Sequence, residues 1–355
     1  MLLDFCCSRF REGSPPLAPK QMPVACATER RHDQSVDTTP PNRDVPSRLK
    51  PGVDYPVDER GLIELFRPDV DARRSLKRFT GWPKGITCPR CKTALKCLGK
   101  DLFLASCSEH SCCYNVTLTE KSLFHGVKAG LRVWIEAAWY IAENGKSGWS
   151  IPGLAERMVI SPGLARACLA QYRRVMGTCN RDPIEGRIVY GTTNLSLTEK
   201  RQEEGSRQEV QVLMVLAVPG PEIRGQLRLR VLGSGKDGTA LTDSLQSIAP
   251  GAEVITVETA KKAEVTLGSR RLADIKRDLN RWIRTLHGDA IHAIHLQPYL
   301  DEYCFFHNQK RGTPPGVIFR KLIELAMNTP PIKRKPPKQA GPVNSVSAGS
   351  SLEGS

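Results

Sequence analysis

The pattern of apolar and polar positions is helical between residues 131 and 144. Leu131, Trp134 and Ala138 recur three or four positions apart, which places apolar side chains on one face. The pattern stops near Asn144, where the glycine that follows favours a helix end. This stretch is therefore predicted to be an amphipathic helix.

Two shorter helical patterns follow, over residues 151–158 and from Ser161 onward. Ser161 is a good N-cap, and the proline after it suits the first helical position. Two short helices joined by a three-residue turn, the second carrying arginines, match a helix-turn-helix whose second helix enters the major groove of DNA. An ordinary helical hairpin with solvated arginines would produce the same pattern. The candidate DNA contacts are Arg132, Ser161, Arg166, Arg173 and Arg174.

Shorter elements are predicted on both sides of these helices. Before them, residues 62–79 have helical spacing, and small strands are expected at residues 102–104 and 114–117. After residue 183, strands are expected at 187–189, 208–218, 227–231 and 254–257, and helices at 239–248, 272–286, 296–308 and 316–327. This order predicts an α/β core with a mixed sheet.

The length of 355 residues allows two or three domains. Both ends are rich in Pro and Ser without any period, so we expect them to be disordered. The predicted organisation is a disordered N-terminal region (1–54), a helical lead-in (55–82), a cysteine-rich segment (83–128), the helix-turn-helix (129–180), the mixed α/β region (181–327) and a disordered basic tail (328–355).

The charge balance points to a polyanionic partner. The chain has 52 Lys and Arg against 37 Asp and Glu, a formal net charge of +15 and a pI near 9.4. Double-stranded DNA is the natural candidate, and a basic surface kept only for solubility is the alternative. No apolar run approaches membrane-spanning length and no secretory signal is evident, so a soluble, cytoplasmic and nucleoid-associated protein is expected, with no membrane partner.

Several of the twelve cysteines are spaced like metal ligands. Cys88 and Cys91 form one pair, and Cys107 opens a second cluster about fifteen residues later. This is the spacing of a zinc ribbon, because each pair tips a tight turn and the hairpin between them brings the tips together. A Cys-x-x-Cys pair alone could equally be a redox pair. The second cluster favours a structural Zn²⁺, which stabilises a unit too small to have a core.

The second cluster offers two candidates for the fourth ligand. His110 restores the two-residue gap after Cys107 and is favoured, whereas Cys112 would give a wider loop and is the alternative. Cys97 and Cys113 are expected to be packing thiols.

Four passages carry a resemblance to a known family. They are residues 82–91 (WPKGITCPRC), 122–140, 154–176 and 296–308 (LQPYLDEYCFFHN). In these passages the chain resembles prokaryotic insertion-sequence transposases, which have an N-terminal zinc ribbon and helix-turn-helix before a DDE-type, RNase H-like catalytic domain. The resemblance implies an α/β multi-domain protein whose DNA partner is the ends of a mobile element. A homo-oligomer would be compatible with that role.

The resemblance also implies an active site that this chain lacks in part. Such enzymes hold two Mg²⁺ ions with three carboxylates. The first acid belongs in a motif like Glu-Val-Asp-Glu-Thr, but residues 187–193 read RIVYGTT, with no acid. The second position falls at Val257, with Glu258 next to it. The third falls near Asp274, with Asp278 one turn further on.

Three hypotheses follow. The first is a transposase-family DNA-binding protein whose carboxylates are lost, so that DNA cleavage and strand transfer are impaired. The second is an active transposase that binds Mg²⁺ through displaced acids, with Glu185, Glu258 and Asp274 or Asp278 as the candidate ligands. The third is a transcriptional regulator that uses its zinc ribbon for protein contact. We prefer the first, because a one-residue shift on a strand turns a side chain to the opposite face.

Overall fold

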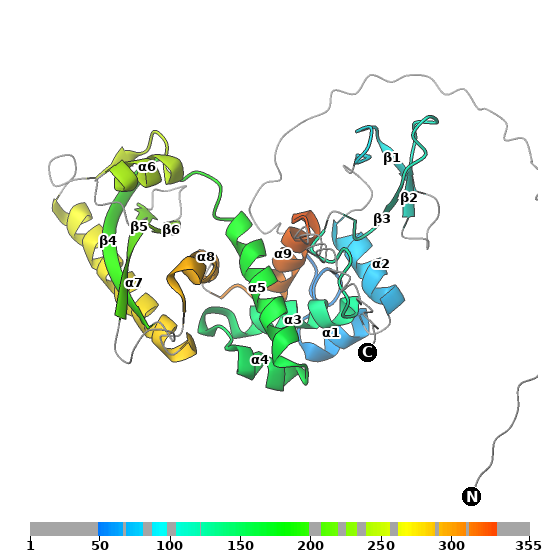
Figure 1. Cartoon of the computed structure of the whole chain (residues 1–355), viewed down its shortest axis with the longest axis horizontal. Coiled ribbons are helices and arrows are strands. Elements are labelled where there is room, and N and C mark those ends of the chain that lie inside the picture. Colours follow the sequence, from blue (N-terminus) through cyan, green and yellow to red (C-terminus); the bar gives the residue numbers. More distant parts are fainter. Residues whose placement is uncertain are drawn as a thin grey trace, which may run out of the picture. The chain divides into compact units, whose positions relative to one another are not determined.

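A computed structural model describes residues 49–66, 69–80, 87–97, 104–120, 122–198, 207–218, 225–232, 239–255, 262–287, 291–309 and 312–331. Its architecture is mixed α/β, as predicted, with one three-stranded and one four-stranded sheet among these residues (Figure 1). The predicted disordered ends lie outside the described residues, apart from the few next to the folded part. No helix in the described ranges is both long and apolar enough to span a bilayer.

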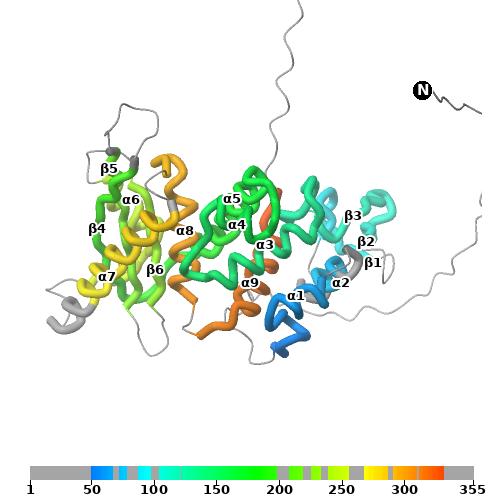
Figure 2. The backbone as a smooth tube through the Cα atoms, turned by 90° about the horizontal axis from the view of Figure 1, so that it is seen from below, coloured from blue at the N-terminus to red at the C-terminus, as the bar shows by residue number. Residues whose placement is uncertain are grey.

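One hydrophobic core is formed by helices from both halves of the sequence. It contains α1 (Glu59–Phe66), α2 (Asp69–Thr80), α3 (Leu131–Asn144), α4 (Ile151–Met158), α5 (Pro162–Thr178) and α9 (Pro315–Asn328). The last helix, α9, returns to pack on α3 (Figures 1 and 2). Phe319 of α9 contacts the rings of Phe66 and Trp139 edge to face. The region predicted as 181–327 therefore does not share one core, because α9 packs with the N-terminal helices.

The small sheet is an antiparallel meander of β1 (Leu95–Cys97), β2 (Leu104–Cys107) and β3 (Asn115–Thr117). The strand predicted at 114–117 is confirmed to within one residue. The other predicted strand, at 102–104, meets the described part of the chain only at its last residue, where β2 begins and continues to Cys107. β2 therefore ends on a candidate metal ligand.

The large sheet has the order β6-β5-β4-β7. Its strands are β4 (Arg187–Thr198), β5 (Arg207–Ala217), β6 (Leu227–Val231) and β7 (Glu253–Val254). In sequence, α6 (Thr239–Ile248) lies between β6 and β7, and α7 (Lys262–His287) and α8 (Leu296–His307) follow β7. Short 3₁₀ turns lie at Gly145–Ser147 and Ala293–His295. β4, β5 and β6 are antiparallel in sequence, whereas β7 is parallel to β4.

β4 is twelve residues long, far longer than the strand predicted at 187–189. β4 pairs residue by residue with β5 along this length, from Ile188 opposite Ala217 to Thr198 opposite Arg207. Leu195 and Leu197 of the extension are buried and alternate with exposed residues. This alternation is the period-two signal of a strand, which sequence reasoning did not follow past residue 189.

The two faces of the large sheet are covered by different helices. α7 packs on one face through Leu272, Ile275 and Leu279. α6 packs on the opposite face, where a second, smaller hydrophobic cluster is buried. Gly268 lets α7 approach β4 closely, because a Cβ there would lie 2.8 Å from Cγ1 of Val189. The backbone of α7 therefore packs directly against the side chain of Val189 on β4.

The free edge of β6 is covered by side chains of α8 and of Asn308, the residue that caps α8. The amide of Asn308 donates to the carbonyl of Leu227 and accepts from its N–H, and Gln297 bonds Leu229 and Val231 in the same way. These amides replace a neighbouring strand, which protects the edge from pairing with another chain. Both belong to residues 296–308, one of the passages that carry the family resemblance.

Candidate metal centre and nucleic-acid surface

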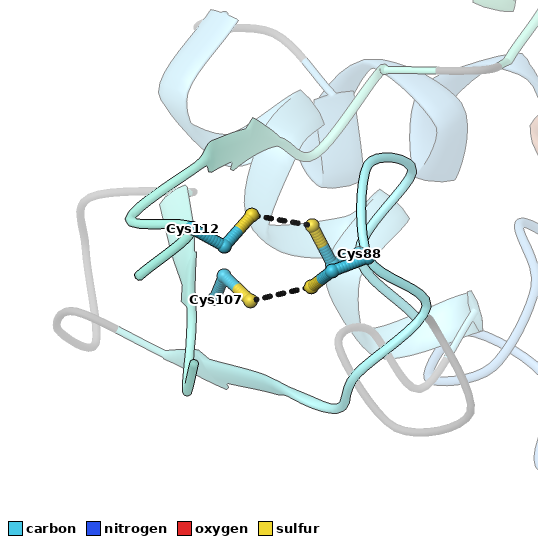
Figure 3. A group of neighbouring side chains, drawn as sticks. Cys88, Cys107 and Cys112 are labelled. Carbon is cyan, nitrogen blue, oxygen red and sulfur yellow. Dashed lines mark hydrogen bonds between the residues drawn. The ribbon is translucent and has the colours of Figure 1, made fainter. Parts of the chain in front are cut away.

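Four cysteines meet at the tip of the small sheet. Cys88 and Cys91 lie on the turn before β1, Cys107 ends β2, and Cys112 lies on the turn that leads to β3. Their sulfur atoms all lie within 4.8 Å of one another (Figure 3). No other group of three or more potential metal ligands occurs in the described ranges.

The two turns hold the sulfur atoms in similar ways. The N–H of Arg90 points to Sγ of Cys88, and the N–H of Glu109 points to Sγ of Cys107, each over 3.4 Å. Such N–H groups favour a negative charge on sulfur. The residue after the last ligand of each turn, Lys92 and Cys113, has a positive φ, of 67° and 45°. Each turn thus reverses tightly around its pair of thiols.

The separations of the sulfur atoms fit a tetrahedral metal site. Sγ of Cys88 lies 3.7 Å from Sγ of Cys112 (Figure 3). Sγ of Cys91 lies 3.2 Å from Sγ of Cys107. Four sulfurs at about 2.3 Å from a zinc ion would be about 3.8 Å apart. All four are free cysteines, and both separations are far above the roughly 2.05 Å of a disulfide. The donor set is therefore compatible with a structural zinc ion.

The preference for His110 as fourth ligand is wrong in this geometry, and the alternative, Cys112, occupies the place. The N–H groups of Cys112 and Cys113 both donate to the carbonyl of Glu109, and this turn folds Cys112 back toward Cys107. His110 is exposed on the outside of the turn and is not part of the cluster. Cys113 is also exposed, not packed as predicted.

The protonation of the thiols depends on their surroundings. Burial raises the pKa of Cys107 to about 12, whereas hydrogen bonding with Thr93 lowers the pKa of Cys91 to about 6. A bound cation would be coordinated by thiolates and would displace these protons.

The predicted helix-turn-helix elements are present as two helices and a tight turn. α4 and α5 begin at Ser150 and Ser161, whose hydroxyls accept hydrogen bonds from the N–H groups of Gly153 and Leu164. Val159 ends α4 with a left-handed φ of 53°. The predicted N-cap at Ser161 and the proline at the first helical position are confirmed.

The structure separates the predicted DNA contacts. Arg166 is exposed on the N-terminal half of α5, and Arg132 is exposed on α3, where it pairs with Glu136 over 2.6 Å. Arg174 is half-buried, and its Nε donates to Gln171. Ser161 is exposed and caps its helix.

Arg173 cannot contact DNA, so this prediction is wrong. Its side chain is buried, pairs with Glu302 of α8 over 2.6 Å, and lies over the ring of Tyr299. The sequence held a signal for this burial, because Arg173 is four residues after Leu169 and three before Met176, both buried.

The structure does not bring the candidate carboxylates together. Glu185 is exposed before β4, and Glu258 and Val257 lie outside the described residues. Asp274 and Asp278 are exposed and pair with Arg277 and Arg281, at 2.6 and 3.5 Å. At about 100° per residue, both fall away from the face of α7 that packs on the sheet.

Gly191, within residues 187–193 where the first acid was expected, faces α7. A Cβ on Gly191 would lie 3.5 Å from Cδ1 of Leu272, and its neighbours on the same face of β4, Val189 and Thr193, are buried. The middle of β4 therefore contacts an apolar helix face at this point. The sequence showed that the expected acid is absent from this strand, but it held no signal for the contact between Gly191 and Leu272.

No protein-family model matches the chain, and no curated protein matches its sequence. The fold and the site thus define a mixed α/β protein with a four-cysteine cluster suited to a metal ion.

Proposed function

We propose that this protein binds double-stranded DNA through α4 and α5, and that it is a transposase-family protein with impaired strand cleavage. The observation that carries the proposal is the division of α5 into two parts. Its C-terminal half is buried against the core and α8, whereas its N-terminal half exposes Pro162, Gly163 and Arg166. In a helix-turn-helix, the N-terminal residues of the second helix contact the base edges.

The anchoring of α5 supports this role. Arg173 pairs with Glu302, Asn180 donates to Asp301, and Arg228 of β6 donates to the carbonyl of Cys179 at the C-cap of α5. These contacts hold the C-terminal end of α5 against α8 and β6. A recognition helix held in this way presents its N-terminal end in one orientation, which lowers the entropic cost of binding.

The four cysteines would hold a structural Zn²⁺. The ion would link the turn before β1 to the turn after β2, in a small sheet with few buried side chains of its own. Loss of metal is expected to unfold this sheet without removing the helical core.

The large sheet supports descent from an RNase H-like domain. Three antiparallel strands are followed by a helix and a fourth strand parallel to the first, which is the arrangement such domains share. Gly191 replaces the first carboxylate, and Asp274 and Asp278 are turned away from the sheet. A site of this composition would bind Mg²⁺ poorly, because charged ligands recruit the hard cation.

The test is DNA binding by the full chain, measured by fluorescence anisotropy on duplexes selected from a random pool. We expect Arg166→Ala to weaken binding of the selected sequence by about 1–3 kcal/mol, the usual value of one base contact. Arg60→Ala is the matched control, because Arg60 is 88% exposed on α1 and pairs only locally, with Glu64. Equal effects of the two substitutions would contradict our placement of the DNA surface.

A second assay addresses cleavage. We expect no nicking of DNA that carries the selected sequence when Mg²⁺ or Mn²⁺ is added. Metal-dependent nicking would show that displaced acids restore the site. No salt-dependent DNA binding at all would instead favour the regulator that contacts protein.

A further inference from the structure

The long helix α7 has a strongly basic outer face. The helix has 26 residues and so is about 39 Å long. Its inner face is buried through Leu272, Ile275, Leu279 and Ile283. On the outer face, Lys276, Arg277, Arg281 and Arg284 are exposed and line one shallow groove together with Ala273, Asn280 and Thr285.

The spacing of these cations is regular. Arg277, Arg281 and Arg284 recur every three or four residues, so they form one row with about 5–6 Å between successive members. The short side chains of Ala273 and Thr285 line the same groove. A polyanionic chain could therefore lie along the helix and meet one cation per helical turn.

The neighbouring acids do not cancel this row. Asp274 pairs with Arg277, and Asp278 pairs with Arg281, both on the surface. Exposed pairs of this kind contribute little to stability. A guanidinium has five N–H donors, so a pair with one carboxylate leaves donors for another anion. Each acid also restrains its arginine, which lowers the entropic cost of ordering that side chain on binding.

The end of this helix lies beside the predicted DNA-reading unit. Gly148, in the loop just before α4, packs so closely on α7 that a Cβ there would be 2.5 Å from Cδ1 of Leu286. The basic row ends at Arg284, half a turn before that contact. The two surfaces therefore belong to adjoining elements.

We propose that the outer face of α7 binds the sugar-phosphate backbone of double-stranded DNA without regard to sequence. The surface consists of charge in a shallow groove on one helix, which suits contacts with phosphates. It is a second surface, on another element than α4 and α5, and does not depend on base readout by Arg166.

The experiment compares two triple variants of the full chain on a random-sequence duplex. One variant is Arg277→Gln, Arg281→Gln, Arg284→Gln. The control is Lys50→Gln, Arg60→Gln, Arg73→Gln, which removes the same charge from exposed residues of the N-terminal part. Far-UV circular dichroism and urea unfolding should show that both variants remain folded, since surface changes usually alter stability little.

We expect the α7 variant to bind at least tenfold more weakly at low salt, and its plot of log affinity against log salt to be shallower by about 2–3, since each phosphate contact contributes about 0.9. The control should resemble the unmodified chain. Equal behaviour of the two variants would overturn the proposal. The proposal would also be overturned if the α7 variant lost binding to vesicles containing phosphatidylserine while its DNA binding stayed unchanged, because the face would then bind a membrane surface.

Arg166→Ala, measured in parallel, separates the two proposals. It should weaken binding of the selected sequence and leave the random duplex unaffected. If it has no effect while the α7 variant does, the placement of base readout fails and the backbone surface stands. If only Arg166→Ala has an effect, the α7 surface is wrong.

Discussion

Nε of Arg173 lies 2.6 Å from a carboxylate oxygen of Glu302, and both side chains are almost completely buried. The pair joins α5 to α8, two helices separated by the whole large sheet in sequence. Gln297 of α8 and its C-cap residue Asn308 also hydrogen-bond to the edge of β6. The helix proposed to read DNA is thereby connected to the sheet through one intervening helix.

Replacing Arg173 should therefore affect stability first. Arg173→Ala leaves the Glu302 carboxylate buried without its charge partner, and we expect a loss of about 3–5 kcal/mol in the free energy of unfolding. Urea unfolding of the full chain measures this loss. The double variant Arg173→Met, Glu302→Leu should recover much of the stability, because no buried charge remains unpaired. An unchanged stability in Arg173→Ala would show that the arginine faces solvent.

The metal site makes a prediction about two neighbouring residues. Cys112→Ser should reduce bound zinc in the purified protein after competition with a chromogenic chelator, whereas His110→Ala should leave about one zinc per chain, because four ligands complete a structural site. Elemental analysis by mass spectrometry provides the measurement. The reverse result would return His110 to the site.

Gly191 allows a matched comparison of size and charge. Gly191→Ala should be close to neutral, because its Cβ would be in ordinary contact with Leu272 at 3.5 Å. Gly191→Asp should destabilise the protein by about 1–3 kcal/mol, since it places a carboxylate against an apolar helix face. Thermal unfolding distinguishes the two. We also expect no nicking by the Asp variant, and nicking would mean that the other ligands are in place.

His307 should make stability depend on pH. Burial, together with the charge of Lys146, lowers its pKa from 6.5 to about 4. Between these values the unfolded chain binds more protons than the folded one, so stability is full above pH 6.5 and falls as pH drops toward 4. The loss should reach up to about 3 kcal/mol, at about 1.4 kcal/mol per pKa unit. The measurement is urea unfolding at several pH values.

The control for this prediction is His307→Gln. This variant should lose the part of the pH dependence that lies between pH 4 and 6.5. Because the comparison is with the unmodified chain, contributions of other groups cancel. These include Asp301, whose pKa burial raises. Identical pH profiles for the two proteins would contradict a half-buried, neutral His307.

Local features of the sequence were enough to predict several elements. The helices at residues 151–158 and 239–248 are found at the predicted bounds, and the N-cap at Ser161 is confirmed. These features depend on spacing within one element and on capping, which are local properties of the chain. Three of the four metal ligands were predicted for a similar reason, since the Cys88–Cys91 turn is local and Cys107 opens a second cluster at a fixed distance along the chain.

Other features were decided only when distant segments met. Cys112 rather than His110 joins the cluster because its sulfur meets that of Cys88, 24 residues away, at 3.7 Å, and the spacing after Cys107 allowed either residue. The role of Arg173 depends on Glu302, which is 129 residues away. Gly191 faces Leu272 only because α7 crosses β4. By itself, the sequence determined where most helices and strands and the first three ligands lie, though not the length of β4, because these follow from short-range patterns. The tertiary structure alone decided which charges are buried and which remain available to a partner, because burial depends on what packs against each side chain.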